Sequence, residues 1–377
     1  VPIELLIFVP AVSMLITIIF DSRLGFNSTI ILALVVGALR GNDYTFAAMN
    51  IFAGALAVYT VRDVKNRSQI FRSFIFILLG YTTAILAFGL ERFETLEVMG
   101  IEFAFAASNS LISPALTFGL LIFFERIFKI TTDLTLLELS DFDRPLLREL
   151  ARKAPGSFTH SMTMGTLAES AAESIKANPL LARVGAYYHD IGKTIAPINF
   201  VENQLNNENR HEKIPPEESA KMIIDHVNEG IELAKANKIP KEITDFIPMH
   251  HGTTMVSFFY EKAKKLYGDD KVDEKDYRYP GPKPNTKETA IVMLADACES
   301  AVRSISEPGP QKVDNIISRL IKTRVDDGQL DESPLTFNDL RKIKEAFLVI
   351  LLGQHHRRIR YPKQDEMESG KDEEIKK

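Results

Sequence analysis

The sequence predicts an all-α protein in which a bundle of transmembrane helices is followed by a helical soluble domain. Residues 1–128 are dominated by Leu, Ile, Phe, Ala and Val, whereas the remainder is rich in charged residues. The whole-chain mean hydropathy of −0.03 therefore averages two unlike parts. From residue 157 onward, apolar residues recur at steps of three and four, which is the period of an amphipathic helix. Alternating runs typical of strands are not found there.

Five apolar stretches mark the membrane part, and a span needs about 20 mostly apolar residues. The stretches cover residues 3–20, 26–39, 44–61, 71–90 and 99–125. The first, fourth and fifth reach this length, while the second and third are short. Residues 1–128 are thus predicted to form about five spans. Because Val1 lies inside an apolar run, we interpret the region as N-terminally truncated.

Charges between the stretches predict the orientation. Basic residues gather in the 62–72 loop and again directly after the fifth stretch, at Arg126 and Lys129, whereas the 91–97 loop is acidic. The positive-inside rule places the basic segments, and everything after residue 126, in the cytoplasm. We therefore expect a multi-pass protein of the cell inner (cytoplasmic) membrane. No charged residue lies deep within a stretch, which favours an anchor or sensor over a transporter.

Composition excludes several classes of protein. The net charge is −5 and no block of Lys and Arg occurs, so we expect no DNA or RNA partner. Cys298 is the only cysteine, which excludes intrachain disulfides and cysteine-based zinc motifs.

The polar part of the chain divides into three segments. Residues 129–156 are predicted to be a helical linker that is broken near 141–145, and residues 157–362 a helical domain. The charged segment 363–377 has no apolar anchors and is predicted to be disordered. The helices expected in the domain are 159–177, 180–190, 216–237, 240–251, 254–267, 286–305, 311–326 and 336–353.

Seven histidines and aspartates recur beside the apolar helical segments of this domain. They are His160, His189, Asp190, His226, His250, His251 and Asp296. A single buried histidine is usually a satisfied core residue, but burying seven such groups is costly unless they are paired or bind metal. Imidazole and carboxylate suit Fe, Mn or Zn. The adjacent His189 and Asp190 can supply a terminal imidazole and a carboxylate that bridges two ions, and two ions can activate hydroxide for attack on a phosphodiester.

The ordered set H…HD…H…HH…D resembles the HD superfamily of metal-dependent phosphohydrolases. The segments "GSFTHSMTMGTLAESAAE", "ANPLLARVGAYYHDIGK", "HHGTT", "YPGPKPNTKETAIVMLADACESAVRS" and "DDGQLDESPLT" are similar to the seven-transmembrane HD phosphodiesterases of bacteria. The similarity extends over most of residues 125–362. It implies an all-helical HD phosphodiesterase domain, in the cytoplasm, behind a transmembrane helical bundle.

The resemblance also implies a substrate, cofactors and partners. The family cleaves cyclic di-AMP to the linear dinucleotide pApA with two divalent metal ions, iron or manganese, and zinc is a further candidate. One ion would be held by His160, His189, Asp190 and Asp296, and the second by His226, His250 and His251, with Asp190 bridging. Family members carry an extracytoplasmic domain and further spans ahead of this region. The expected partners are therefore a cyclic dinucleotide, the lipid bilayer, a second copy of the chain and an unknown extracytoplasmic ligand.

Four residues near these motifs are candidate substrate contacts. Lys193 follows Asp190 by three positions and would oppose charge developing on the scissile phosphate, so we assign it a catalytic role beside Asp190. Thr253 and Thr254 could donate to phosphate or could cap the next helix. Arg303 lies two helical turns after Asp296 and could reach a second phosphate or form a surface ion pair.

Two other functions compete with this prediction. Hydrolases of cyclic di-GMP have similar ligands but typically carry a Gly-Tyr-Pro signature, which does not occur in this chain. A non-catalytic nucleotide-binding receptor would be expected to lose metal ligands, and all seven are present here. Both alternatives therefore rank below hydrolysis of cyclic di-AMP.

Overall fold

The computed structural model describes residues 2–204, 210–305 and 309–354, and the predicted disordered segment 363–377 lies outside them. These residues form helices and connecting loops with no strand, and a single isolated β-bridge joins Met255 to Arg278. The all-α prediction is confirmed. The chain divides into two compact units: Val1–Pro155 with Ile191–Thr194 and Gly230–Asp245, and Gly156–Asp190 with Ile195–Glu229 and Phe246–Lys377.

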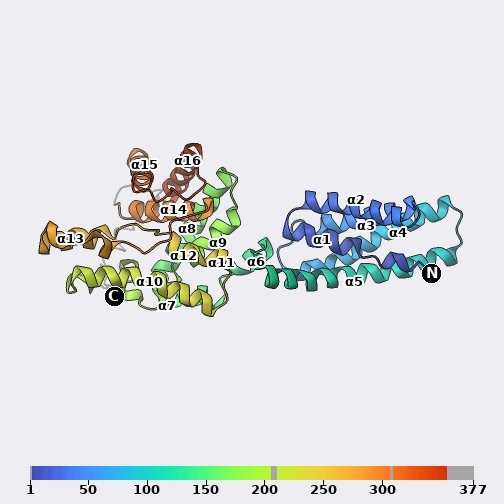
Figure 1. The fold of residues 1–377 in the computed structure, drawn as a ribbon, viewed down its shortest axis with the longest axis horizontal. Coiled ribbons are helices and arrows are strands. Elements are labelled where there is room, and N and C mark those ends of the chain that lie inside the picture. Colours follow the sequence, from blue (N-terminus) through green and yellow to red (C-terminus); the bar gives the residue numbers. More distant parts are fainter. Residues whose placement is uncertain (1, 205–209, 306–308, 355–377) are drawn as a thin grey trace, which may run out of the picture. The chain divides into compact units, whose positions relative to one another are not determined.

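Five apolar helices form the bundle of the first unit (Figure 1): α1 (Val9–Ile19), α2 (Ser22–Leu39), α3 (Tyr44–Val61), α4 (Ser73–Glu91) and α5 (Leu96–Phe128). Four helical segments in the described part of the chain are long and apolar enough to cross a membrane, namely Ser22–Leu39, Tyr44–Val61, Arg67–Glu91 and Leu96–Phe128. The third of these is the short 3₁₀ helix η2 (Arg67–Arg72) followed by α4. The protein is therefore a membrane protein.

The first two helices differ in length from the predicted stretches. The second stretch, 26–39, lies within α2, a helix of 18 residues, whereas the third stretch, 44–61, becomes α3 with the same bounds. The Asp21 and Asp43 side chains accept hydrogen bonds from the backbone N–H groups of Leu24 and Phe46, so α2 starts four residues before its apolar run and α3 starts at the first residue of its own. The first stretch is instead divided into η1 (Ile3–Leu6) and α1, which has only 11 residues.

A side chain from α5 satisfies the break in the first stretch. Asn109 is fully buried, and its Nδ2 donates to the carbonyl oxygens of Leu5 at 2.6 Å and Ile7 at 3.1 Å. Its Oδ1 accepts a hydrogen bond from Ser113. Backbone groups inside an apolar bundle need such partners because no water is present to replace them. Asn109 thus takes over the role that helical hydrogen bonding plays elsewhere in the bundle.

Small residues allow the helices of the bundle to approach closely. A Cβ atom added at Gly80 of α4 would lie 2.8 Å from the Ala53 backbone of α3, and one added at Gly54 would meet Thr29 of α2. Close backbone approach at small residues is typical of helix packing in membranes. Large apolar side chains such as Leu34, Ile75 and Leu111 are exposed on the outside of the bundle. This distribution suits a bundle surrounded by lipid.

An ion-pair network joins the bundle to the start of the linker. Arg67 of η2 contacts Glu125 of α5 at 2.9 Å and Glu138 of α6 (Asp133–Leu139) at 2.8 Å. Glu125 also accepts hydrogen bonds from the hydroxyl groups of Thr132 and Thr135. Beneath this network, Leu134 of α6 packs against Leu15, Ile70 and Leu121. The linker is therefore fixed to the end of the bundle by both charge and apolar contact.

Replacing Arg67 with Met is expected to lower the unfolding free energy by about 1–3 kcal/mol, because two partly buried glutamates lose their shared donor. Thermal unfolding of the detergent-solubilised chain measures this. Arg62→Met is the matched control: Arg62 pairs with its neighbour Asp63 and is 52% exposed, so the change should leave the melting temperature nearly unchanged. Equal melting temperatures for the two variants would contradict the role of Arg67.

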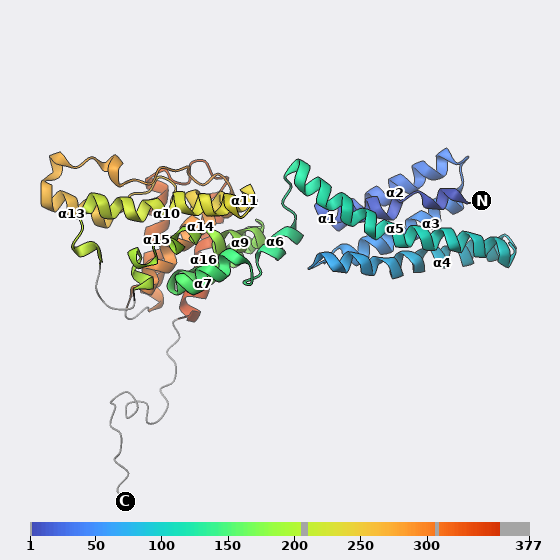
Figure 2. The same cartoon turned by 90° about the horizontal axis from the view of Figure 1, so that it is seen from below.

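The linker continues into α7 (Pro145–Lys153), and helices of the second unit follow. They are α8 (Pro155–Ser174), α9 (Pro179–Tyr188), α10 (Pro216–Ala236), α12 (Phe246–Met249), α13 (Ser257–Tyr267), α14 (Lys287–Arg303), α15 (Pro310–Asp326) and α16 (Phe337–Gln354). Helix α14 is the centre of this unit and contacts α9, α12, α15 and α16 (Figure 1). Its residues 290–295 are almost completely buried. Helix α10 packs against α13 through Ala220, Phe259 and Ala263 (Figure 2).

One expected helix of the soluble part is divided. The sequence predicts a single helix over residues 240–251, but this range contains α11 (Lys241–Thr244) and α12, separated by Asp245. Proline has no N–H, so Pro248 cannot donate to the carbonyl of Thr244 as a continuous helix would require. The chain then turns at Gly252, whose φ is +55°. This turn directly follows the two adjacent histidines.

Candidate metal centre

The structure brings all seven predicted ligands together in the second unit. His160 lies on α8, His189 and Asp190 directly follow α9, and His226 lies on α10. His250 and His251 follow α12, and Asp296 lies on α14. Their donor atoms fall into three overlapping groups, in each of which the atoms lie within 4.8 Å of one another: His160, His189 and Asp296; His226, His250 and His251; and His189, Asp190 and His250. We call the first group the first metal position and the second group the second metal position.

Asp190 lies between the two positions. Its Oδ2 is 3.2 Å from Nε2 of His189, and its Oδ1 is 3.5 Å from Nε2 of His226 and 3.7 Å from Nε2 of His250. Asp190 is 1% exposed, so a charge here is screened little by solvent. The two oxygens of one carboxylate thus face ligands of different positions. This is the arrangement that a bridging carboxylate requires.

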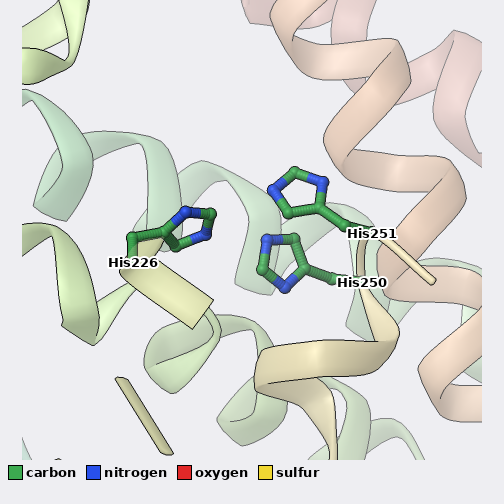
Figure 3. Close-up of side chains that lie close together, drawn as sticks. All are labelled: His226, His250 and His251. Atoms are coloured by element: carbon green, nitrogen blue, oxygen red, sulfur yellow. The ribbon is translucent and has the colours of Figure 1, made fainter. Parts of the chain in front are cut away.

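Backbone carbonyls orient three of the imidazoles. Nδ1 of His189 lies 2.6 Å from the Ala186 oxygen, Nδ1 of His226 lies 2.5 Å from the Ile223 oxygen, and Nδ1 of His250 lies 3.1 Å from the Phe246 oxygen. An Nδ1–H that donates to a carbonyl leaves the Nε2 lone pair available for a metal ion. Figure 3 shows His226 approaching His250 and His251 from a separate helix. The ring centroids of His226 and His251 are 5.2 Å apart.

The electrostatics of the cluster suit a cation. Burial, with the neighbouring His189, lowers the pKa of His250 to about 3, so its imidazole is neutral at physiological pH. Burial would also lower the pKa of His160, but hydrogen bonds with Asp296 and Glu299 outweigh it and raise this pKa to about 9. Among the residues that the structure describes, the buried Nε2 atoms of His189 and His250 find no hydrogen-bond partner. Buried nitrogen lone pairs of this kind are costly unless a ligand satisfies them. The donor set therefore fits divalent metal ions.

The structure does not show that the four predicted substrate contacts face the metal positions. The Thr253 hydroxyl is bonded to Gln329, and the Thr254 hydroxyl donates to the His251 carbonyl at 2.8 Å. Arg303 is 44% exposed and pairs with Glu299 at 3.3 Å. Lys193 lies in η3 (Ile191–Thr194) and is partly exposed. Contact of these four residues with a substrate stays a prediction.

Sequence reasoning missed a polar network behind the turn that follows the paired histidines. Gln329 is fully buried and accepts a hydrogen bond from the Thr253 N–H at 3.0 Å. It also donates to Asp327, which pairs with Arg278, and Arg278 donates to the Thr253 carbonyl at 2.8 Å. Next to Arg278, the Tyr279 ring stacks on His251 with centroids 4.0 Å apart. No local spacing in the sequence signals these contacts, because Thr253 and Gln329 are 76 positions apart.

Glu299 is a second residue that sequence reasoning missed, although its spacing from Asp296 could have indicated it. Glu299 lies three residues after Asp296 on α14, so the two carboxylates share one face of the helix. Its Oε2 is 2.7 Å from Nδ1 of His160, and its side chain is 6% exposed. An acidic residue one turn after a predicted ligand is therefore the pattern that would have identified it.

Comparison with known proteins shows the family to which the chain belongs. The family model described as "7TM receptor with intracellular HD hydrolase" matches residues 3–132, and the HD domain model matches residues 157–301. A solved structure, the Listeria monocytogenes phosphodiesterase PgpH HD domain in complex with cyclic-di-AMP, is 46% identical with a TM-score of 0.54. The match covers 58% of this chain and all of that one. The chain belongs to this family of membrane-bound HD hydrolases.

Two curated relatives extend the similarity into the membrane helices. The cyclic-di-AMP phosphodiesterase PgpH of Bacillus subtilis is 37% identical over 373 residues, which cover 95% of this chain and 51% of the relative. The protein of the same name from Listeria monocytogenes is 40% identical over 356 residues, covering 93% and 49%. The chain thus spans about half the length of the curated relatives it matches. Membrane helices and HD domain follow each other in this family as they do here.

Proposed function

We propose that this chain is the membrane-anchored catalytic part of a phosphodiesterase that hydrolyses cyclic di-AMP to pApA, using hydroxide that two metal ions activate. The observation that carries the proposal is the placement of Asp190 between two groups of histidines. A single carboxylate with its two oxygens directed to different ligand groups suits a pair of ions better than one ion. The complete set of seven ligands supports catalysis over a receptor that only binds nucleotide.

We propose the same division of ligands between the two ions as the sequence predicts. His160, His189, Asp190 and Asp296 would hold one ion, and His226, His250 and His251 would hold the other, with Asp190 shared. Two bound ions would supply Lewis acidity toward the phosphate and a hydroxide nucleophile near neutral pH. Iron or manganese fits this mixed imidazole and carboxylate set, and zinc is also compatible with it.

Around the ions, the proposed role of the protein is to orient the phosphodiester and balance its charge. Lys193 would oppose negative charge that develops on the scissile phosphate. Thr253 and Thr254 could contact a phosphate only by exchanging their hydrogen bonds to Gln329 and to the His251 carbonyl. Arg303 retains donors beyond the one that pairs with Glu299, so it remains a candidate contact for a second phosphate.

The choice of substrate is supported by relatives rather than by a residue that reads adenine. Both curated relatives are named for cyclic-di-AMP, and the similar HD domain was solved in complex with it. Basic residues in the 62–72 loop and after α5 support an orientation with the catalytic domain in the cytoplasm, at the inner (cytoplasmic) membrane. A homodimer and an extracytoplasmic ligand that acts through the membrane helices complete the proposal.

The test uses the whole chain, purified in detergent under reducing conditions and loaded with Mn²⁺ or Fe²⁺. Cyclic di-AMP and cyclic di-GMP are incubated separately, and products are separated by chromatography. We expect metal-dependent formation of pApA and much slower turnover of cyclic di-GMP. Preferred turnover of cyclic di-GMP would reject the substrate but keep the centre. Binding of a dinucleotide without turnover of either would reject catalysis.

A further inference from the structure

His160 is held differently from the other imidazoles of the metal centre. The Nδ1 atoms of His189, His226 and His250 face backbone carbonyl oxygens. Nδ1 of His160 instead faces the Glu299 carboxylate at 2.7 Å, while its Nε2 lies 3.1 Å from Asp296. Both partners of the short contact are buried, His160 at 2% exposure and Glu299 at 5%. At His160, the partner of Nδ1 is therefore a charged carboxylate, whereas at the other three histidines it is a neutral backbone carbonyl.

The geometry of α14 places both contacts on a single imidazole. Asp296 and Glu299 are separated by three residues, so their side chains emerge about one helical turn apart on the same face. This face of α14 meets α8 at His160. Asp296 contributes a donor atom to the first metal position, and Glu299 contacts the opposite side of the same ring. One rigid helix thus sets both the position and the rotation of His160.

The second oxygen of Glu299 also has a partner. Oε1 lies 3.3 Å from Nη1 of Arg303, one turn further along α14. Arg303 is 44% exposed, so it lies between solvent and the buried pair of His160 and Glu299. Glu299 consequently has one oxygen for His160 and one for Arg303. Neither contact requires a substrate.

We infer that Glu299 is a positioning residue that sets the metal affinity of the first metal position by orienting His160 and increasing the basicity of its Nε2. The inference rests on the proposed two-metal function. A carboxylate that accepts from a ligating histidine fixes the ring and strengthens its donation to the ion, and losing such a partner typically costs 10- to 100-fold in metal affinity. Glu299 contacts His160, which belongs to the first metal position, so the second metal position should respond far less.

The variant that tests this is Glu299→Gln in the whole detergent-solubilised chain. The Gln amide oxygen can still accept from Nδ1–H, but the negative charge is gone. Mn²⁺ bound per chain is measured by elemental analysis after equilibrium dialysis over a range of free Mn²⁺. We expect two sites in the unmodified protein. In the variant, one site should weaken by about 10- to 100-fold while the other keeps its affinity.

Glu288→Gln is the matched control, because Glu288 lies on the same helix and accepts a hydrogen bond from the Asn178 N–H at 2.8 Å instead of contacting a proposed ligand in the described structure. It should bind Mn²⁺ like the unmodified protein. Melting temperatures in metal-free buffer check that the variants fold, and Glu299→Asp, which keeps the charge but shortens the reach, should recover part of the affinity. These comparisons separate a positioning role from a purely structural one.

Two results would overturn the inference. Wild-type affinity at both sites of Glu299→Gln would show that the carboxylate does not act on the metal. Equal weakening of both sites would show a general effect rather than one through His160. Failure of the proposed function is distinguishable, because an unmodified protein that binds two Mn²⁺ ions but does not cleave cyclic di-AMP would reject the activity and leave this measurement intact.

Discussion

Replacing Asp190 with Asn is expected to reduce the proposed hydrolysis of cyclic di-AMP by roughly 10³-fold or more, because one substitution alters both metal positions. Asp190 is 1% exposed and lies within 3.7 Å of Nε2 atoms of three histidines. The amide of Asn has nearly the same shape but cannot present two anionic oxygens. Turnover and bound metal per chain are measured on the same preparation, and both should fall.

The control for this variant is Asp270→Asn, a change of the same chemistry at an exposed position of the same domain. It should keep wild-type activity and metal content. Melting temperatures of both variants in metal-free buffer check that each of them folds. Retention of more than a tenth of the activity by Asp190→Asn would reject the bridging role.

Gly185→Ala is expected to cost about 1–3 kcal/mol of unfolding free energy, through overpacking. An added Cβ would lie 2.5 Å from two ring carbons of Phe246, which is 1% exposed. The Phe246 carbonyl accepts from both the N–H and the Nδ1 of His250, and His189 lies one turn after Gly185. The strain should therefore reach ligands on both sides of the centre. Thermal unfolding and metal content measure the two effects.

Gly353→Ala is the comparison for this change, because a Cβ added there meets no atom of the described residues within 4 Å outside its own helix, α16. It should leave stability unchanged or increase it by roughly 0.5–1 kcal/mol. The double variant Gly185→Ala, Phe246→Leu should recover part of the loss by making room. If Gly185→Ala has the same melting temperature as the unmodified protein, the packing of α9 on α12 is looser than the structure shows.

Much of the fold followed from the sequence, because helical periodicity and apolar length are local signals. The sequence did not predict the helix ends and helix breaks that depend on other parts of the chain. Helix α2 is longer than its apolar run because Asp21 caps it ahead of that run, and a search for apolar runs omits the polar residues of its first turn. The break after Leu6 is satisfied by Asn109, a hundred positions away.

The candidate site shows the same division. The seven proposed ligands could be picked out because each is a costly residue next to an apolar segment, and the structure brings them together. Glu299 and Gln329 were missed because their partners, His160 and Thr253, are 139 and 76 positions away. Thr253, Thr254 and Arg303 have the right chemistry for phosphate, but only the structure reveals that each already has an internal partner.

The dependence of the first helix on Asn109 also bears on how the membrane part is made. During synthesis, the carbonyl group of Leu5 leaves the ribosome about a hundred residues before the Asn109 amide that bonds it, whereas the Ile7 carbonyl also accepts from the Val9 N–H at 2.8 Å. An unpaired carbonyl group is costly in lipid, so the segment around Leu5 cannot settle stably without that amide. Stable insertion of α1 should therefore wait for α5, and a ribosome stalled before residue 109 should leave α1 accessible to water-soluble labels.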